Sequence, residues 1–191
     1  MTEQLTPSPE TVDVDMPTDL AVEDDEYILR ALSSDDVNGA KRVRWQAVAP
    51  RATEESASVM RLRLMGADKA KKKALEIKGA KYCGFGRALA ETFREHAREV
   101  VDSRRHYYGH ADLEHGFPRP PADPPPPPGA PVPSSGAYRD AIKHYRAIAN
   151  NLCFFEDTPT PEAWSGADLE EACAEEGCEP TCTHPVPADS H

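Results

Sequence analysis

The chain has 191 residues, of which 19 are proline and 39% are hydrophobic, so its apolar residues suffice for one modest packed core. No stretch approaches the roughly 20 consecutive apolar residues that a membrane-spanning helix needs, which excludes a membrane protein of that kind. Residues 1–25 contain eight acidic residues and no Lys or Arg, the opposite of an export signal, and favour a cytoplasmic protein. The five cysteines are an odd number, so we expect reduced thiols.

Charge is distributed unevenly along the chain, whose formal net charge is −11. Residues 26–118 hold 18 Lys and Arg against 13 Asp and Glu and are therefore basic, at +5, whereas residues 1–25 and 119–191 each carry −8. Acidic ends keep a basic domain in solution, and they also compete with other anions for its surface. The distribution predicts a basic core that contacts an anionic partner, with the acidic ends modulating access.

The first part of the chain is predicted to contribute the sheet. Residues 1–25 combine a high acidic load with three prolines and scattered aliphatic residues, and are expected to be disordered. Residues 26–32 form a short apolar run that predicts a first strand. Apolar and polar residues alternate over residues 42–49 and again over residues 58–64, which is the period of half-buried strands. The polar loop over residues 50–57 is short enough to join these two as an antiparallel pair.

Two helices are predicted after these strands. Residues 66–79 contain five lysines and end in glycine, so helix propensity and the expected C-terminal cap both indicate a basic helix. Apolar residues recur near the helical period over residues 87–100, which predicts an amphipathic helix that packs on the sheet. Val100 and Val101 indicate the start of a further strand.

The last third of the chain begins with a proline-rich segment. Residues 117–136 contain ten prolines and are predicted to form an extended linker. Residues 137–166 begin with an amphipathic helix that is expected to pack on the core. Its apolar face consists of Tyr138, Ile142, Tyr145, Ile148 and Leu152. Residues 167–191 are again acidic and contain prolines and three cysteines, and are expected to be a disordered tail.

Together these elements predict one α+β domain, in which a small antiparallel sheet is covered by two or three helices. Disordered acidic termini and the Pro-rich linker accompany it. Its compact part consists of residues 26–116, the α+β core, and residues 137–166, a helix and a strand-like segment that pack on this core across the linker.

The order of short motifs resembles that of a set of small uncharacterised bacterial proteins. The resemblance covers residues 27 to about 156 and ends with the final helix. The matching residues are Tyr27 with Arg30, Trp45 with Ala47, Ser58 with Val59, and His110 with Ala111 near Gly116. The resemblance implies one compact α+β unit and implies no activity.

A histidine-rich segment is the first candidate site. It offers three imidazoles and two carboxylates within ten residues: His106, His110, Asp112, Glu114 and His115. Such ligands suit zinc, manganese or iron, and three of them with an open position for water are typical of a metal-dependent hydrolase or nuclease. The alternative is that these histidines make buried hydrogen bonds or face solvent at a turn, with no cofactor bound.

Two further chemistries stay open. An ADP-ribosyltransferase-like enzyme would use Arg30 on the first strand, Ser58 at a strand start and Glu114 as a late acid. Cys83, which precedes a short glycine pair, is predicted to be a buried small residue at a helix entry rather than a nucleophile. Four tail residues could hold a structural zinc ion, namely Cys173, Cys178, Cys182 and His184.

The leading prediction is a non-catalytic function. Lys and Arg side chains on the basic helix and on exposed strand faces are suited to neutralising phosphates. The predicted anion-binding residues are Arg42, Arg44, Arg61, Arg63, Lys69, Lys72 and Lys73. The protein would then be a soluble cytoplasmic accessory or binding protein whose basic core contacts nucleic acid or another anionic partner, without attachment to a membrane. Lysines also fill the solvent face of a helix simply because they are good helix formers.

Overall fold

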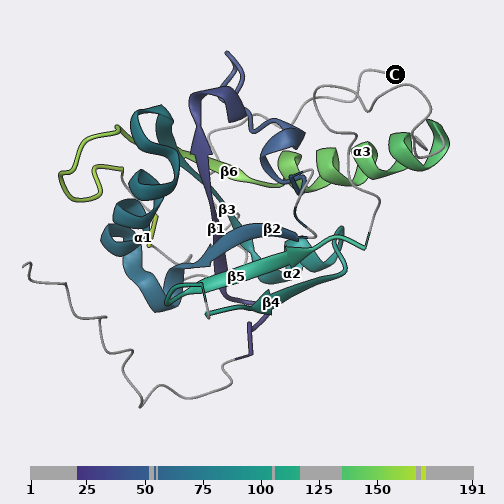
Figure 1. Ribbon diagram of the computed structural model, residues 1–191, viewed down its shortest axis with the longest axis horizontal. Helices are drawn as coiled ribbons and strands as arrows, with labels where there is room; N and C mark the ends of the chain where they lie inside the picture. The colour runs from purple at the N-terminus through teal and green to yellow at the C-terminus, as the bar shows by residue number, and fades with distance from the viewer. Residues whose placement is uncertain are drawn as a thin grey trace, which may run out of the picture.

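Six strands form one antiparallel sheet through the centre of the protein, in the order β4-β5-β2-β1-β3-β6 (Figure 1). The strands are β1 (Tyr27–Ser33), β2 (Ser56–Arg61), β3 (Tyr82–Leu89), β4 (Glu99–Asp102), β5 (His110–Glu114) and β6 (Cys153–Glu156). The structure is a computed structural model, and it describes residues 21–51, 54, 56–104, 106–116, 135–166 and 169–170. Most of the predicted linker and of the two acidic ends lies outside these ranges.

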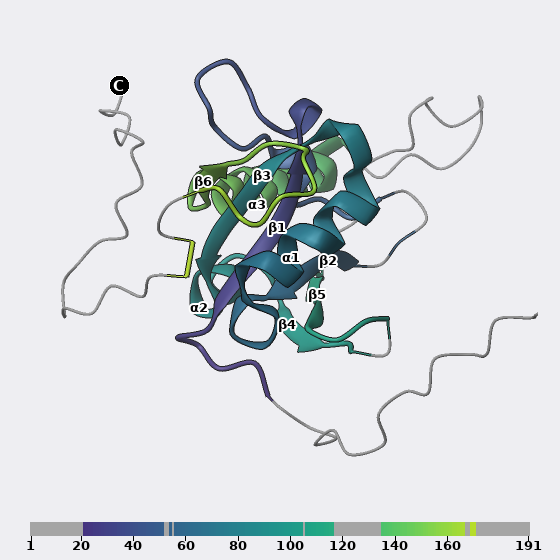
Figure 2. The ribbon, with the colours of Figure 1, turned by 90° about the vertical axis from the view of Figure 1, so that its left-hand side faces the viewer.

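Helices cover both faces of the sheet, as Figures 1 and 2 show from two sides. α1 (Leu62–Lys78) packs against one face, while α2 (Ala90–Arg94) and α3 (Ser135–Asn150) pack against the other. Neighbouring residues of β1 accordingly enter different cores, Ile28 under α3 and Leu29 under α1. The predicted α+β class is confirmed. None of the helices in the described ranges has the length and apolar character needed to cross a bilayer.

β1 and β2 pair over two residues and then separate. The register joins Ile28 to Arg61 and Leu29 to Met60, whereas β1 pairs with β3 along its whole length. The next carbonyl on the β1 side of β2, that of Ser58, accepts a hydrogen bond from an Arg30 side-chain nitrogen instead of from the β1 backbone. The separation of the two strands therefore places Arg30 between them, which positions the candidate site described below.

The segment 42–49, predicted to be a strand, is not one. Val43 makes a single bridge to Val37, and Trp45–Ala47 form a short 3-10 helix. Its predicted partner is β2, which pairs instead with β1 and β5. Because both sides of β2 are occupied, segment 42–49 has no strand to join there. The alternation still marked the buried side chains correctly, since Val43 and Ala47 lie in the core under α3.

The segment 87–100, predicted to be one helix, is divided between three elements. Its first residues belong to β3, the next to α2, and β4 begins at Glu99. The first residues are extended because β3 lies between two strands, with Arg87 paired to Leu29 of β1 on one side and to Cys153 of β6 on the other. Cys83 therefore lies within a strand and not at the helix entry that the sequence suggested.

The basic helix and the last helix lie close to their predicted positions. α1 ends before Gly79, whose φ of +56° is the expected glycine cap. It begins at Leu62, earlier than predicted, and is kinked at Gly66, where φ is +67°. α3 and the following strand β6 account for the helix and strand-like segment predicted within residues 137–166.

Packing extends into both segments that were predicted to be disordered. Val22 is buried in the core under α3, and Leu169 in the core under α1. Asp24 also pairs with Arg94. The compact body therefore includes the described residues of these segments. Cys153 is disulfide-bonded, which corrects the expectation of a reduced thiol at this position.

Candidate functional site

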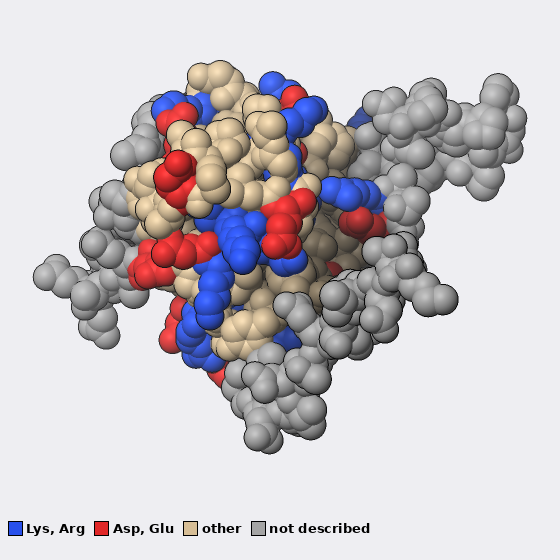
Figure 3. All heavy atoms as spheres, turned by 60° about the vertical axis from the view of Figure 1, so that its left-hand side comes forward, with Lys and Arg blue, Asp and Glu red and all other residues tan. Residues whose placement is uncertain are grey.

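Five of the seven predicted anion-binding residues are exposed, as the prediction requires. These are Arg42, Arg44, Arg63, Lys69 and Lys72. On the face shown in Figure 3, Lys and Arg side chains gather near the centre, with Asp and Glu side chains on either side of them. The charge on this face is therefore mixed, which weakens its attraction for a polyanion.

Arg61, predicted to lie on an exposed strand face, is completely buried, with 0% of its side chain exposed. Its guanidinium donates hydrogen bonds to both carboxylate oxygens of Glu26, at 2.8 and 2.7 Å, and to Asp102 at 2.5 Å. Burial alone would raise the pKa of Asp102, but hydrogen bonds from Arg104 and Arg61 outweigh it and lower that pKa. Arg61 is a structural ion-pair residue, and no ligand can reach it.

Three lysines of α1 are bound by acidic side chains of the protein itself, and the third, Lys78, lies at the pocket described below. Lys71 is buried and pairs with Asp157 at 3.1 Å. Lys73, the last predicted anion-binding residue, pairs with Glu76 at 2.5 Å and lies 4.9 Å from the ring centre of Tyr107. The positive charge that α1 presents to a partner is therefore smaller than its sequence suggests.

A pocket of about 190 Å³ lies where β1 and β2 separate. Its polar lining consists of Arg30, Arg51, Glu54, Ser58, Lys78 and Tyr107. These residues come from β1, the loop before β2, β2 itself, the end of α1 and the loop before β5. The pocket is thus assembled from parts of the chain that are far apart in the sequence.

Arg30 is the central cation of this pocket. Its Nε donates to the carbonyl oxygen of Ala47 at 2.6 Å, and its Nη1 donates to the carbonyl oxygen of Ser58. Burial lowers the pKa of Arg30, and Asp36 and Glu54 oppose this shift only in part. In the described part of the chain no carboxylate forms an ion pair with Arg30. A partly buried guanidinium without such a partner has N–H groups left to donate to an anion.

Tyr107 brings a buried hydroxyl group close to Arg30. Among the described residues this hydroxyl has no hydrogen-bond partner. Burial raises the pKa of Tyr107 to about 12, with Arg30 opposing the shift. The hydroxyl is therefore protonated at neutral pH and able to donate a hydrogen bond.

Two further cations at the pocket are each paired with one acid. Lys78 pairs with Asp36 at 3.0 Å, and Arg51 lies 3.7 Å from Glu54. Burial lowers the pKa of Lys78, which the Asp36 carboxylate opposes. Among the described residues three cations thus face two carboxylates, and Arg30 is the cation that forms no ion pair with either of them.

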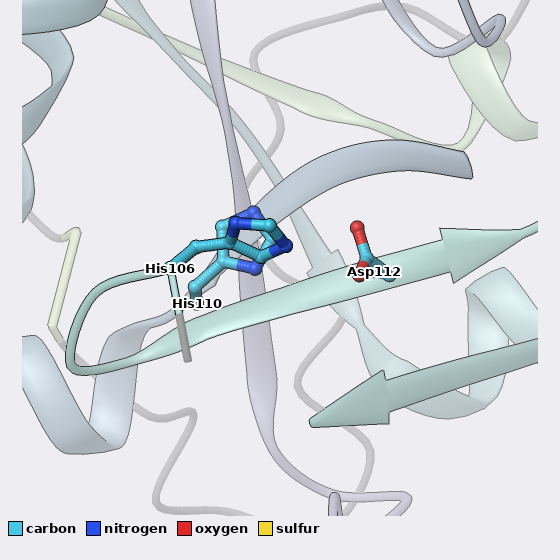
Figure 4. A group of neighbouring side chains, drawn as sticks. All are labelled: His106, His110 and Asp112. Carbon is cyan, nitrogen blue, oxygen red and sulfur yellow. The ribbon is translucent and has the colours of Figure 1, made fainter. Parts of the chain in front are cut away.

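Three of the five predicted metal ligands come together at the start of β5. One ligand atom from each of His106, His110 and Asp112 lies within 4.8 Å of the others. His110 and Asp112 are alternate residues of β5 and project to the same side of it, and His106 approaches from the preceding loop (Figure 4). His106 is exposed and His110 is buried, and burial lowers the pKa of His110.

The other two predicted metal ligands do not join this cluster. His115 is 2% exposed and sets its ring against the edge of Tyr145 in α3, with 4.8 Å between ring centres. Burial lowers the pKa of His115 to about 4, and the Val48 backbone opposes this shift in part. Neither ring nitrogen makes a hydrogen bond of good geometry within the described ranges. His115 is thus a neutral core residue, and Glu114 is an exposed residue at the far end of β5.

The remaining candidates are brought together only in part. Arg30 and Ser58 of the ADP-ribosyltransferase-like prediction meet at the pocket, but Glu114 does not line it. Burial raises the pKa of the Cys83 thiol to about 11, so it is protonated at neutral pH and a poor nucleophile. The four proposed zinc ligands of the tail, including His184, lie outside the described residues.

Gly109 shapes the loop that joins His106 to His110. Its φ is +79°, and a Cβ would lie 2.3 Å from Cγ of Met65. We expect Gly109→Ala to lower the free energy of unfolding by about 2 kcal/mol, because both the backbone and the packing would have to shift. Urea denaturation measures this. The control is Gly39→Ala, where an added Cβ meets nothing within 4 Å, and equal losses in the two variants would contradict the prediction.

Sequence reasoning missed the pocket because its lining does not form a local motif. One feature of the sequence did point to the pocket. Arg30 is a charged residue within the apolar run of the first strand, and a charged side chain needs polar partners when its strand is buried. Nothing in the sequence connects Lys78 or Arg51 with it. Comparisons with protein-family models, with curated proteins and with solved structures found no match for this chain.

Proposed function

We propose that this protein binds a small ligand carrying an oxyanion group, and that the pocket around Arg30 holds that group. The observation that carries the proposal is the partly buried Arg30 guanidinium, which donates to two carbonyl oxygens and forms no ion pair with a carboxylate of the described residues. The proposal keeps the anionic partner expected from the sequence and moves the contact from the exposed lysines to an enclosed site.

The chemistry of the lining favours phosphate or carboxylate. A guanidinium presents several N–H donors in one plane, which match two oxygens of either group. The Tyr107 hydroxyl adds a donor that lacks a partner within the described ranges, and Lys78 adds a second cation. An anion would thus satisfy donors that the folded protein has already desolvated.

The size of the pocket limits how much of a ligand it encloses. Its volume of about 190 Å³ is below the 300 to 1,000 Å³ that is typical for a whole drug-sized ligand. Ile77, 45% exposed, also lines the pocket and offers an apolar surface at its rim. We therefore infer that the anionic group enters the pocket and that the rest of the ligand stays outside it.

Inorganic phosphate and citrate are suitable probes in isothermal titration calorimetry at low ionic strength. We expect Tyr107→Phe to raise the Kd of the better-binding probe about tenfold, because a hydrogen bond to a charged group is lost. Tyr108→Phe is the matched control, since Tyr108 is 39% exposed and does not line the pocket. The Tyr107 hydroxyl has no partner to lose among the described residues, so the variant should fold normally.

Three outcomes would overturn the proposal. The first is that neither probe binds at low salt, and the second is that both Tyr variants bind as the unchanged protein does. The third is that only single- or double-stranded nucleic acid binds, with a steep salt dependence, which would return the contact to the exposed Lys and Arg residues.

A further inference from the structure

The geometry points to a zinc site formed by His106, His110 and Asp112, separate from the donors of the oxyanion pocket. The inference goes beyond the proposed function, because it concerns a different ligand and different side chains. It also reduces the five ligands predicted from the sequence to the three that the fold brings together.

The two ligands on β5 are held in place by neighbouring hydroxyl groups. Nδ1 of His110 lies 2.6 Å from the Ser103 hydroxyl oxygen, and an oxygen of Asp112 accepts a hydrogen bond from the Ser56 hydroxyl at 2.9 Å. Hydrogen bonds of this kind orient metal ligands and fix which nitrogen of a histidine is available. With Nδ1 engaged, Nε2 of His110 is the atom that can bind a metal.

His106 supplies the third ligand from a movable position. Its ring is exposed and packs edge-on against His110, with ring centres 4.8 Å apart. In tetrahedral zinc coordination neighbouring ligand atoms lie about 3.3 Å apart, so the present separations of up to 4.8 Å have to shorten by about 1.5 Å. The His106 side chain can rotate to shorten its own distances, because no described residue binds its ring by a hydrogen bond. The distance between His110 and Asp112 has to shorten through adjustment of those two side chains.

The mixture of ligands selects the metal class. Two imidazoles and one carboxylate combine nitrogen and oxygen donors, which zinc accepts readily, whereas magnesium and calcium prefer oxygen alone. Three protein ligands leave one tetrahedral position for water or an added ligand. Tyr107 contacts the edge of His110, with ring centres 4.7 Å apart, and also lines the oxyanion pocket, so the two sites are neighbours.

Titration with Zn²⁺ against a chromophoric chelator tests the site in the full chain. We expect one zinc ion per chain and a rise in Kd of at least tenfold in both His106→Ala and Asp112→Asn. His106 is exposed, and Asp112→Asn keeps the oxygen that Ser56 binds, so both variants should fold. The matched control is His96→Ala, which removes a histidine outside the cluster and should leave the Kd unchanged.

Cobalt distinguishes this site from the cysteines of the tail. Co²⁺ held by His106, His110 and Asp112 should show visible absorption bands of a tetrahedral ion without the intense near-ultraviolet band of thiolate ligands. Absence of stoichiometric zinc binding, a Kd unaffected by His106→Ala, or a thiolate band in the cobalt spectrum would each overturn the inference. Zinc binding is measured without phosphate, and phosphate binding is measured without metal. Each measurement tests one of the two proposals, so either proposal can fail while the other stands.

Discussion

Replacing Arg61 with Met is expected to lower the free energy of unfolding by about 3 to 5 kcal/mol, the usual effect of removing one partner from a buried ion pair. Arg61 and Glu26 are both completely buried, at 0% side-chain exposure, and two hydrogen bonds join them. Without the guanidinium, the Glu26 carboxylate would stay buried without its main partner or would take up a proton. Urea denaturation at pH 7, monitored by tryptophan fluorescence, measures the loss.

A matched control separates the effect of burial from that of charge. Arg63 lies two residues further along, is exposed, and should change stability by less than about 0.5 kcal/mol when replaced with Met. Combining Arg61→Met with Glu26→Leu also removes the buried carboxylate that has lost its partner. The double variant should recover at least half of the lost free energy of unfolding. Similar losses for Arg61→Met and Arg63→Met would show that Arg61 is not the buried centre of this network.

Stability is expected to fall by about 2 kcal/mol between pH 7.5 and pH 5 through His115 alone. The folded protein holds the pKa of His115 at about 4, whereas the unfolded chain has a value near 6.5. As the pH falls below 6.5, His115 becomes protonated in the unfolded state but stays neutral in the folded state. Proton binding therefore favours the unfolded state. The contribution is fully present above pH 6.5 and is lost progressively as the pH falls towards 4.

His115→Phe tests this assignment, since a phenyl ring retains the edge contact with Tyr145 and cannot titrate. Urea denaturation at a series of pH values should show a shallower decline for this variant than for the unchanged protein. Some decline should remain, because the pKa of His110 is also lowered by burial. His96→Gln is the control and should leave the slope as it is. An identical slope in His115→Phe would contradict the burial of a neutral His115.

The sequence by itself determined those elements in which neighbouring residues all favour the same secondary structure. The apolar run of β1, the lysine-rich helix closed by Gly79 and the apolar face of α3 were each predicted from local periodicity and capping. The antiparallel α+β class followed from their order. The close spacing of His106, His110 and Asp112 was also visible, although the common face of His110 and Asp112 required an extended β5, and the sequence did not predict one.

Only the tertiary structure decided which side of each element is covered and by what. Arg61 and Arg63 are alternate residues of one predicted strand, but the strand ends at Arg61 and a helix follows, so one is buried and the other exposed. Periodicity reports that one face is apolar and carries no information on distant partners such as Glu26. The pocket likewise exists because β1 and β2 separate after two residue pairs, a consequence of packing between segments that are not neighbours in sequence.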